Sequence, residues 1–97
     1  MIDIPTFPNI KPNKELFLKL LEESAEVYSA FEDYKEEDFD FKGCEERILN
    51  ETADVMQVCS NIFAAFHQKP NPFIIEMMER NDARGRYDKE KVNEGWI

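Results

Sequence analysis

The chain has 97 residues, 42% of them hydrophobic, and a formal charge of −9 at pH 7. This length fits one compact domain with a modest core, so burial against a second subunit could complete it. The negative charge argues against a nucleic-acid backbone or an anionic membrane as the main partner, and it favours divalent cations instead.

The N-terminal part predicts an extended arm followed by a helix. The prolines of "MIDIPTFPNIKPN" exclude a regular helix over residues 1–13, because each lacks an N–H group and constrains the residue before it. Asn13 is a favourable N-cap, and apolar residues then recur at helical spacing. We therefore expect the first helix over residues 14–34.

Two further helices follow in the pattern. Gly43 closes an acidic segment, and a second helix is expected over residues 44–67, antiparallel to the first and ended by the prolines of "QKPNP". A shorter third helix over 72–81 begins with a proline suited to a first turn. The expected fold class is all-α: a bundle of two long antiparallel helices plus a shorter third, completed by oligomerisation. One domain results, with its helical core over 14–81 and a basic, aromatic tail over 82–97.

The apolar runs, the first residues and the cysteines indicate the cellular compartment. No apolar run approaches the roughly 18 residues needed to span a bilayer, and no basic-then-apolar leader opens the sequence. Cys44 and Cys59 stand alone within helical patterns, without a CxxC pair or a clustered histidine, so we expect reduced thiols. We predict a cytoplasmic protein with no membrane partner.

Carboxylates interrupt the apolar seam of each long helix. A turn of about 100° per residue places Glu23 and Glu51 at core positions. Glu26 and Asp54 flank them one turn later, since residues three apart are neighbours on a helix surface. The two predicted seams are Leu16, Leu20, Glu23, Val27, Ala30 and Tyr34 on the first helix, and Ile48, Glu51, Val55, Val58, Ile62 and Ala65 or Phe66 on the second.

Such carboxylates require a counter-charge. A buried ionised carboxylate without a partner costs several kcal/mol, and like charges nearby add to this cost. Basic residues on the two helices are few, and a Glu and Asp cluster without His or Cys suits Mg²⁺. A di-iron bundle lacks its Glu-x-x-His pairs here, and His67, the one histidine, is expected at a helix end. A solvated acidic face is the plainer alternative.

The motifs resemble a known family. "KLLEESAEV" fits the pattern EExxE through Glu22, Glu23 and Glu26, and "NETADVMQV" fits ExxD through Glu51 and Asp54. With "ERNDARGRY" after the third helix, their order is similar to that of the all-α, MazG-like nucleoside triphosphate pyrophosphohydrolases. These proteins are related to dimeric dUTPases and phosphoribosyl-ATP pyrophosphatases. The resemblance extends from about residue 14 to 87.

The resemblance implies hydrolysis between the α and β phosphates of a nucleoside triphosphate, giving a monophosphate and pyrophosphate, with Mg²⁺ as cofactor or Mn²⁺ in its place. By motif position the metal ligands are Glu23, Glu26, Glu51 and Asp54. Glu22 points away from the seam, about 100° from Glu23, and is a candidate base or supporting group. The candidate catalytic residues that the resemblance implies are Glu22 and Glu23.

Phosphate oxygens that no metal holds need cationic donors. The third helix and the residues after it carry the only dense basic stretch, although these could be ordinary surface charges. The candidate substrate-binding residues are Lys19, Arg80, Asn81, Arg84 and Tyr87. Members of the family associate, so we expect a homodimer or homotetramer.

Two other functions stay open at this stage. The chain could be a non-catalytic acidic helical protein that binds a basic partner, or a metal or nucleotide sensor that hydrolyses slowly. Carboxylates set into the seam favour a metal site over an interaction surface. Neither the base nor the sugar of the substrate follows from the sequence.

Overall fold

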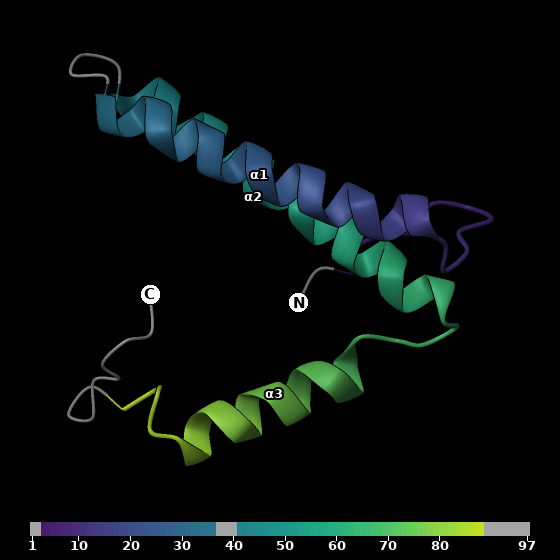
Figure 1. The fold of residues 1–97 in the computed structure, drawn as a ribbon. Coiled ribbons are helices and arrows are strands. Elements are labelled where there is room, and N and C mark those ends of the chain that lie inside the picture. The colour runs from purple at the N-terminus through teal and green to yellow at the C-terminus, as the bar shows by residue number, and fades with distance from the viewer. Residues whose placement is uncertain (1–2, 37–40, 89–97) are drawn as a thin grey trace.

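A computed structural model describes residues 3–36 and 41–88 of the chain. It contains three helices, α1 (Lys14–Glu36), α2 (Phe41–Ala65) and α3 (Asn71–Ala83), and no strand within the described residues. The predicted all-α class is confirmed. Figure 1 shows α1 and α2 side by side and antiparallel, with α3 standing apart from this pair.

Helix α1 begins where the capping signal places it. The Leu16 N–H donates to Oδ1 of Asn13 at 3.0 Å, so the predicted N-cap is confirmed. The helix continues to Glu36, two residues beyond the predicted end at 34. Residues 37–40, part of the acidic segment before Gly43, lie outside the described residues.

Helix α2 begins earlier than predicted. Gly43 was expected to break the chain, but it lies inside the helix, which starts at Phe41 rather than 44. Glycine costs a helix only about 1 kcal/mol relative to alanine, and packing readily overrides this. Here α2 packs along α1, and Arg47 forms an ion pair with Asp33 across the two helices.

The end of α2 is also shifted, from the predicted 67 to Ala65. The His67 N–H donates to the Ala64 carbonyl at 2.9 Å, and the Gln68 N–H donates to the Phe63 carbonyl at 3.0 Å. Together with the left-handed φ of 57° at His67, these bonds form a Schellman motif. His67 thus ends the helix through its backbone, at the position that glycine usually takes.

Helix α3 starts with Pro72 in its first turn, as predicted. It ends at Ala83 instead of 81, so the first residues assigned to the tail are helical. Gly85 has a φ of 69° and donates to the Asp82 carbonyl at 2.9 Å, which closes the helix in a second Schellman motif. Residues 89–97 of the predicted tail lie outside the described part.

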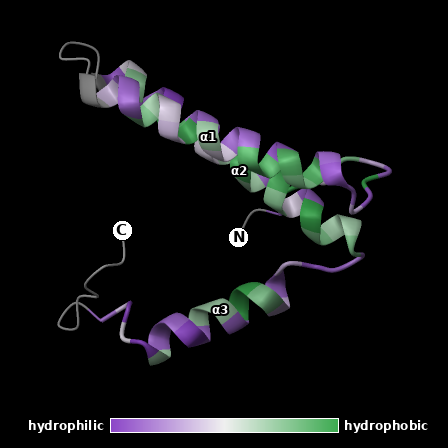
Figure 2. Ribbon diagram, viewed as in Figure 1, coloured by the Kyte–Doolittle hydropathy of each residue, from purple (hydrophilic) through white to green (hydrophobic). Residues whose placement is uncertain are grey.

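The core is small and lies between α1 and α2. Its buried apolar residues are Leu16, Ala30, Val58 and Ala65, and Ile10, Leu20 and Ile62 pack partly against it. Glu23 is buried with them, as the seam predicts, whereas Phe66 is exposed. Figure 2 shows hydrophobic residues toward the end of α2 and in the first turns of α3, and hydrophilic residues at the end of α3.

Helix α3 contributes little to this core. None of its residues is buried, and Phe73, Ile75, Met77 and Met78 are exposed. The Phe73 ring contacts that of Phe63 on α2, with centroids 5.7 Å apart. None of the helices in the described residues combines the length and apolar composition needed to cross a bilayer.

The N-terminal arm folds back against α2. Phe7 donates its backbone N–H to Oδ1 of Asn61 at 3.1 Å, and Gln57 donates from Nε2 to the Pro5 carbonyl at 2.8 Å. The chain reverses at Asn9, whose φ of 60° lies in the left-handed region that asparagine tolerates better than most residues. Residues 3–13 contain no helix, and hydrogen bonds fix the backbone of the arm to α2.

Ala30 provides a test of the α1–α2 contact, because it is only 1% exposed. Ala30→Leu should reduce the free energy of unfolding by about 1–3 kcal/mol, since the added volume cannot fit without moving the helices. Ala25→Leu, at an exposed position of the same helix, is the control and should change stability by less than about 0.5 kcal/mol. Urea unfolding followed by circular dichroism measures both, and equal effects would contradict this helix pairing.

Candidate metal centre

Five carboxylates gather where α1 and α2 face each other. One carboxylate oxygen from each of Glu23, Glu51 and Asp54 lies within 4.8 Å of the others. The same holds for Glu22, Glu23 and Glu26, so Glu23 belongs to both groups. The four predicted metal ligands and the predicted base are therefore brought into one cluster, which we call the carboxylate cluster.

Helical spacing explains how the chain builds this cluster. Glu23 takes a seam position between Leu20 and Val27, and Glu51 takes the equivalent position on α2. Glu26 and Asp54 each follow one turn later and lie beside them. Because the helices are antiparallel neighbours, the two short motifs meet across the contact although they lie far apart in the sequence.

Burial makes Glu23 the centre of the cluster. It is 8% exposed, and its Oε2 is buried without a hydrogen bond in the structure. Oε2 of Glu51 is likewise buried and without a hydrogen-bond partner. A desolvated carboxylate oxygen normally has a partner, because leaving it unpaired costs at least about 1–3 kcal/mol.

Lys19 supplies only part of the counter-charge. Its Nζ lies 3.0 Å from Oε1 of Glu23 and 3.5 Å from Oε1 of Glu22. The hydrogen bond to Glu23, followed by the charges of Glu22 and Glu23, raises the pKa of Lys19 above its usual value. The ammonium group therefore stays charged at neutral pH, but it is half-exposed and forms no hydrogen bond with either orphaned oxygen.

The pKa of Glu26 is shifted by the like charges around it. The charge of Glu23 raises the pKa of Glu26, and partial desolvation and contacts with Glu51 act in the same direction. Glu26 thus interacts with carboxylates on both helices. Its raised pKa means that a bound cation, or a proton, stabilises this position.

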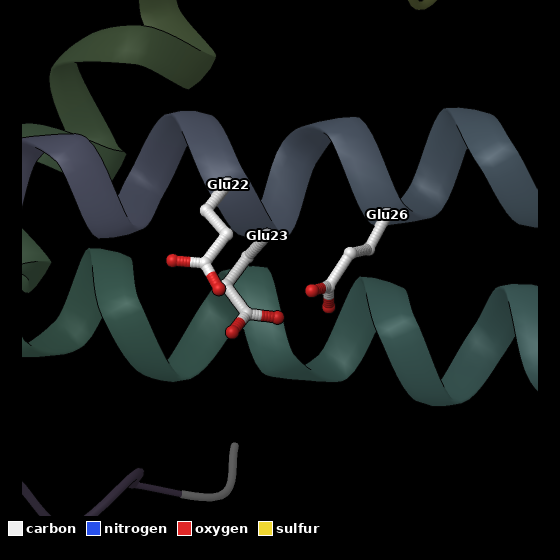
Figure 3. Close-up of side chains that lie close together, drawn as sticks. All are labelled: Glu22, Glu23 and Glu26. Carbon is white, nitrogen blue, oxygen red and sulfur yellow. The ribbon is translucent and has the colours of Figure 1, made fainter.

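Glu22 differs from its predicted direction. The helical pattern places it about 100° from Glu23, and its residue is exposed. Its side chain nevertheless extends with those of Glu23 and Glu26 toward α2, as Figure 3 shows. The helical pattern predicts only the direction of the Cα–Cβ bond. The glutamate side chain has three rotatable bonds, which let its carboxylate reach back to the seam.

The donor set fits a hard divalent cation. Every ligand atom in the carboxylate cluster is a carboxylate oxygen, and the cluster includes no histidine or cysteine. Mg²⁺, Mn²⁺ and Ca²⁺ prefer such oxygen ligands, whereas zinc sites usually include nitrogen or sulfur. The two buried, orphaned oxygens of Glu23 and Glu51 give this fit a structural basis beyond the presence of acidic side chains.

A pocket of about 500 Å³ adjoins the carboxylate cluster. Its walls come from the N-terminal arm, the first turns of α1 and the middle of α2, and they include Lys19, Glu23 and Asp54. Pockets for small molecules typically measure about 300–1,000 Å³. The carboxylate cluster therefore borders an open pocket of this size through Glu23 and Asp54.

The predicted substrate-binding residues separate into two groups. Lys19 lines the pocket, but Arg80, Asn81, Arg84 and Tyr87 do not. They lie on α3 and the turn after it, where the Asn81 Nδ2 donates to the Tyr87 hydroxyl at 3.3 Å. Within this chain, the structure brings the carboxylates and Lys19 together but leaves the other four residues elsewhere.

Sequence reasoning missed Asn61, which lines the pocket and is only 3% exposed. Its signal was present, because Asn61 follows Val58 by three residues and precedes Ala65 by four. The rule that identified Glu23 and Glu51, a polar side chain within an apolar seam, applies to it equally. Gln57 and the arm were missed because their contribution depends on how the arm folds back.

Comparison of the chain with protein-family models, curated proteins and solved structures finds no match. The resemblance to the MazG-like family therefore stays a prediction from the motifs, and the chemistry of the site depends on its own geometry.

Glu26→Gln tests the like-charge repulsion. The raised pKa means that the folded state binds more protons than the unfolded state just above the ordinary value of 4.5, so stability falls as pH rises through this region. In EDTA at pH 7, the substitution should raise the melting temperature, and this gain should disappear below about pH 4, where Glu26 is protonated in both states. Scanning calorimetry across this range measures the effect.

The exposed Glu45 of α2 provides the control, since Glu45→Gln removes the same charge outside the cluster. It should show a smaller change without this pH dependence. A lower melting temperature for Glu26→Gln at pH 7 in EDTA would contradict the repulsion.

Proposed function

We propose that the protein is a Mg²⁺-dependent nucleoside triphosphate pyrophosphohydrolase that cleaves the α–β anhydride bond and releases a nucleoside monophosphate and pyrophosphate. The observation that carries the proposal is the pair of buried, unpartnered oxygens of Glu23 and Glu51, in a cluster whose Glu23 and Asp54 line a pocket of about 500 Å³. Clearance of surplus or damaged nucleotides in the cytoplasm is the role that we propose for it.

The four metal ligands in this proposal are Glu23, Glu26, Glu51 and Asp54. They come from both helices, so binding a cation would also hold α1 against α2. When bound, Mg²⁺ neutralises charge on the phosphate groups and activates water for attack. Mn²⁺ can replace it, because the donor set consists of oxygens.

Glu22 and Glu23 are the proposed catalytic residues. Glu22 is exposed and close to the ligands, so its carboxylate can accept a proton from an attacking water. Glu23 orients the site as the ligand shared by both carboxylate groups. Lys19 pairs with both glutamates and also lines the pocket, where its ammonium group can pair with a phosphate oxygen.

A homodimer or homotetramer is part of the proposal. None of the residues of α3 is buried, and its Ile75, Met77 and Met78 are exposed. Several exposed apolar side chains on one element often mark a contact with another protein. This exposure supports burial against a second copy.

Assembly also explains the position of the basic residues. Arg80 and Arg84 lie on α3 and at its end, away from the pocket lining of their own chain. In an assembly, α3 can pack against the partner and bring these cations, with Asn81 and Tyr87, to the phosphates bound there. Each site would then contain residues from two subunits.

Pyrophosphate release is the direct test of activity. With a panel of nucleoside and deoxynucleoside triphosphates and Mg²⁺, Glu23→Gln and Asp54→Asn should each lower kcat/KM at least about 100-fold, because both substitutions weaken the metal site. Glu45→Gln is the control and should match the wild type. Pyrophosphate and orthophosphate are measured separately, and Mg²⁺ binding is followed by calorimetry.

The other outcomes distinguish the alternatives. Orthophosphate as the sole product would contradict cleavage at the α–β bond. Binding of Mg²⁺ and nucleotide without turnover would contradict the enzyme and favour the sensor. Absence of Mg²⁺ and Mn²⁺ binding would contradict the metal site and favour an acidic interaction protein.

Oligomerisation is tested by mass photometry or sedimentation at micromolar concentration, where we expect at least a dimer of the 11.5 kDa chain. Met77→Glu changes an exposed apolar residue of α3 and should shift the population toward the monomer, since a charge is costly in an apolar interface. Glu76→Gln, at the neighbouring exposed position, is the control. A wild-type protein that sediments only as a monomer would contradict the proposed assembly.

A further inference from the structure

The pocket beside the carboxylate cluster is lined by apolar as well as charged side chains. Lys19, Glu23 and Asp54 make part of it charged, but Phe7, Ile10 and Val58 make another part apolar. Amide side chains, among them those of Gln57 and Asn61, also line it. A nucleotide has the matching composition, because it combines charged phosphates with a planar ring whose edge forms hydrogen bonds.

Two amides in this wall have fixed orientations. Oδ1 of Asn61 accepts from the Phe7 N–H at 3.1 Å and from Nε2 of Gln57 at 3.2 Å. A backbone N–H can only donate, so the atom of Asn61 that faces it must be the oxygen. Gln57 also donates from Nε2 to the Pro5 carbonyl at 2.8 Å, which can only accept. The hydrogen-bond network therefore determines which way each amide points.

This arrangement leaves one donor group and one acceptor atom of the two amides without a hydrogen bond. Nδ2 of Asn61 and Oε1 of Gln57 form no hydrogen bond within the described part of the chain. The two residues are one turn apart on α2, and both line the pocket. A neighbouring donor and acceptor complement the acceptor and donor on the edge of a nucleobase.

The arm fixes both amides and adds an aromatic side chain. Besides the bonds to Asn61 and Gln57, the Ser60 hydroxyl donates to the Ile4 carbonyl at 3.3 Å. Phe7 lines the pocket and is 57% exposed, so its ring is accessible for stacking. The arm precedes the segment, from about residue 14, that resembles the MazG-like family, so the resemblance assigns it no role.

We propose that the N-terminal arm and α2 form a nucleoside-binding pocket, in which Asn61 and Gln57 bind the edge of the base and Phe7 packs against its ring. The proposal rests on the proposed function, since it places the nucleoside of that substrate beside the carboxylate cluster. The arm then acts as a specificity element for the enzyme.

Fluorescence tests the pocket without turnover. Phe7→Trp is prepared together with Trp96→Phe, so that position 7 carries the only indole. The protein is titrated with deoxynucleoside monophosphates, which contain no α–β bond, and separately with pyrophosphate. Monophosphates should quench the emission through stacking, whereas pyrophosphate should leave it nearly unchanged. No response to any monophosphate up to millimolar concentration would overturn the proposal.

Asn61→Asp tests the edge contact in that reporter protein. It keeps an oxygen for the Phe7 N–H and replaces the Nδ2 donor with a second oxygen. The dissociation constants of monophosphates that place an acceptor at this position should rise about tenfold or more, which corresponds to one lost hydrogen bond. Asn71→Asp adds the same charge at an exposed position of α3 and is the control.

Binding of pyrophosphate by both aspartate variants is followed by calorimetry. An equal loss of monophosphate and pyrophosphate affinity in Asn61→Asp would overturn base recognition, because it would reflect charge alone. Circular dichroism verifies the fold, and Phe7→Ala serves as a second variant that keeps the backbone N–H bonded to Asn61. It should also weaken monophosphate binding, and an unchanged dissociation constant would count against the pocket.

The two proposals can fail separately. Quenching by monophosphates without pyrophosphate release from any triphosphate would keep the pocket and remove the enzyme. Pyrophosphate release with the same KM in the wild type, Phe7→Ala and Asn61→Asp would keep the enzyme and remove the pocket.

Discussion

The constraint on which the structure depends is the burial of the Glu23 carboxylate between two helices. Glu23 is 8% exposed, and Lys19 pairs with only one of its oxygens. A buried carboxylate needs an opposite charge, and the carboxylates of Glu26 and Glu51 nearby increase that need. The contact between α1 and α2 is therefore weakened at the place where it can bind a cation, and a bound cation would strengthen it.

Helix α2 connects this centre to the neighbouring pocket. Glu51, Asp54, Gln57 and Asn61 follow one another at steps of three or four residues, so they lie along one side of the helix. The first two contribute oxygens to the carboxylate cluster, and the last two line the pocket and hold the arm. A single amphipathic helix thus changes along its length from carboxylate to amide side chains.

How far the sequence predicts this molecule depends on the range of the interactions involved. Asn13 caps α1, and Glu23 is buried in the seam, because both follow from local geometry and helical period. The bounds of α2 were predicted at 44 and 67 but lie at Phe41 and Ala65, since packing against α1 overrides the preference of Gly43 and a Schellman motif ends the helix before His67. Asn61 was missed, and the separation of α3 could not be predicted, because both depend on contacts between distant segments.

The state of α3 links fold and function. An isolated helix of fewer than about 12–15 residues is marginal in water, and α3 has 13 residues, none of them buried. Its Ile75, Met77 and Met78 are exposed, and an apolar partner surface would bury them. The same helix carries Arg80, whose guanidinium group is absent from the lining of the pocket that holds the carboxylates. Packing of α3 on a second copy would bury its apolar residues and could bring the Arg80 guanidinium group to the pocket of that copy. The stability of α3 and the proposed catalysis would then both require the assembly.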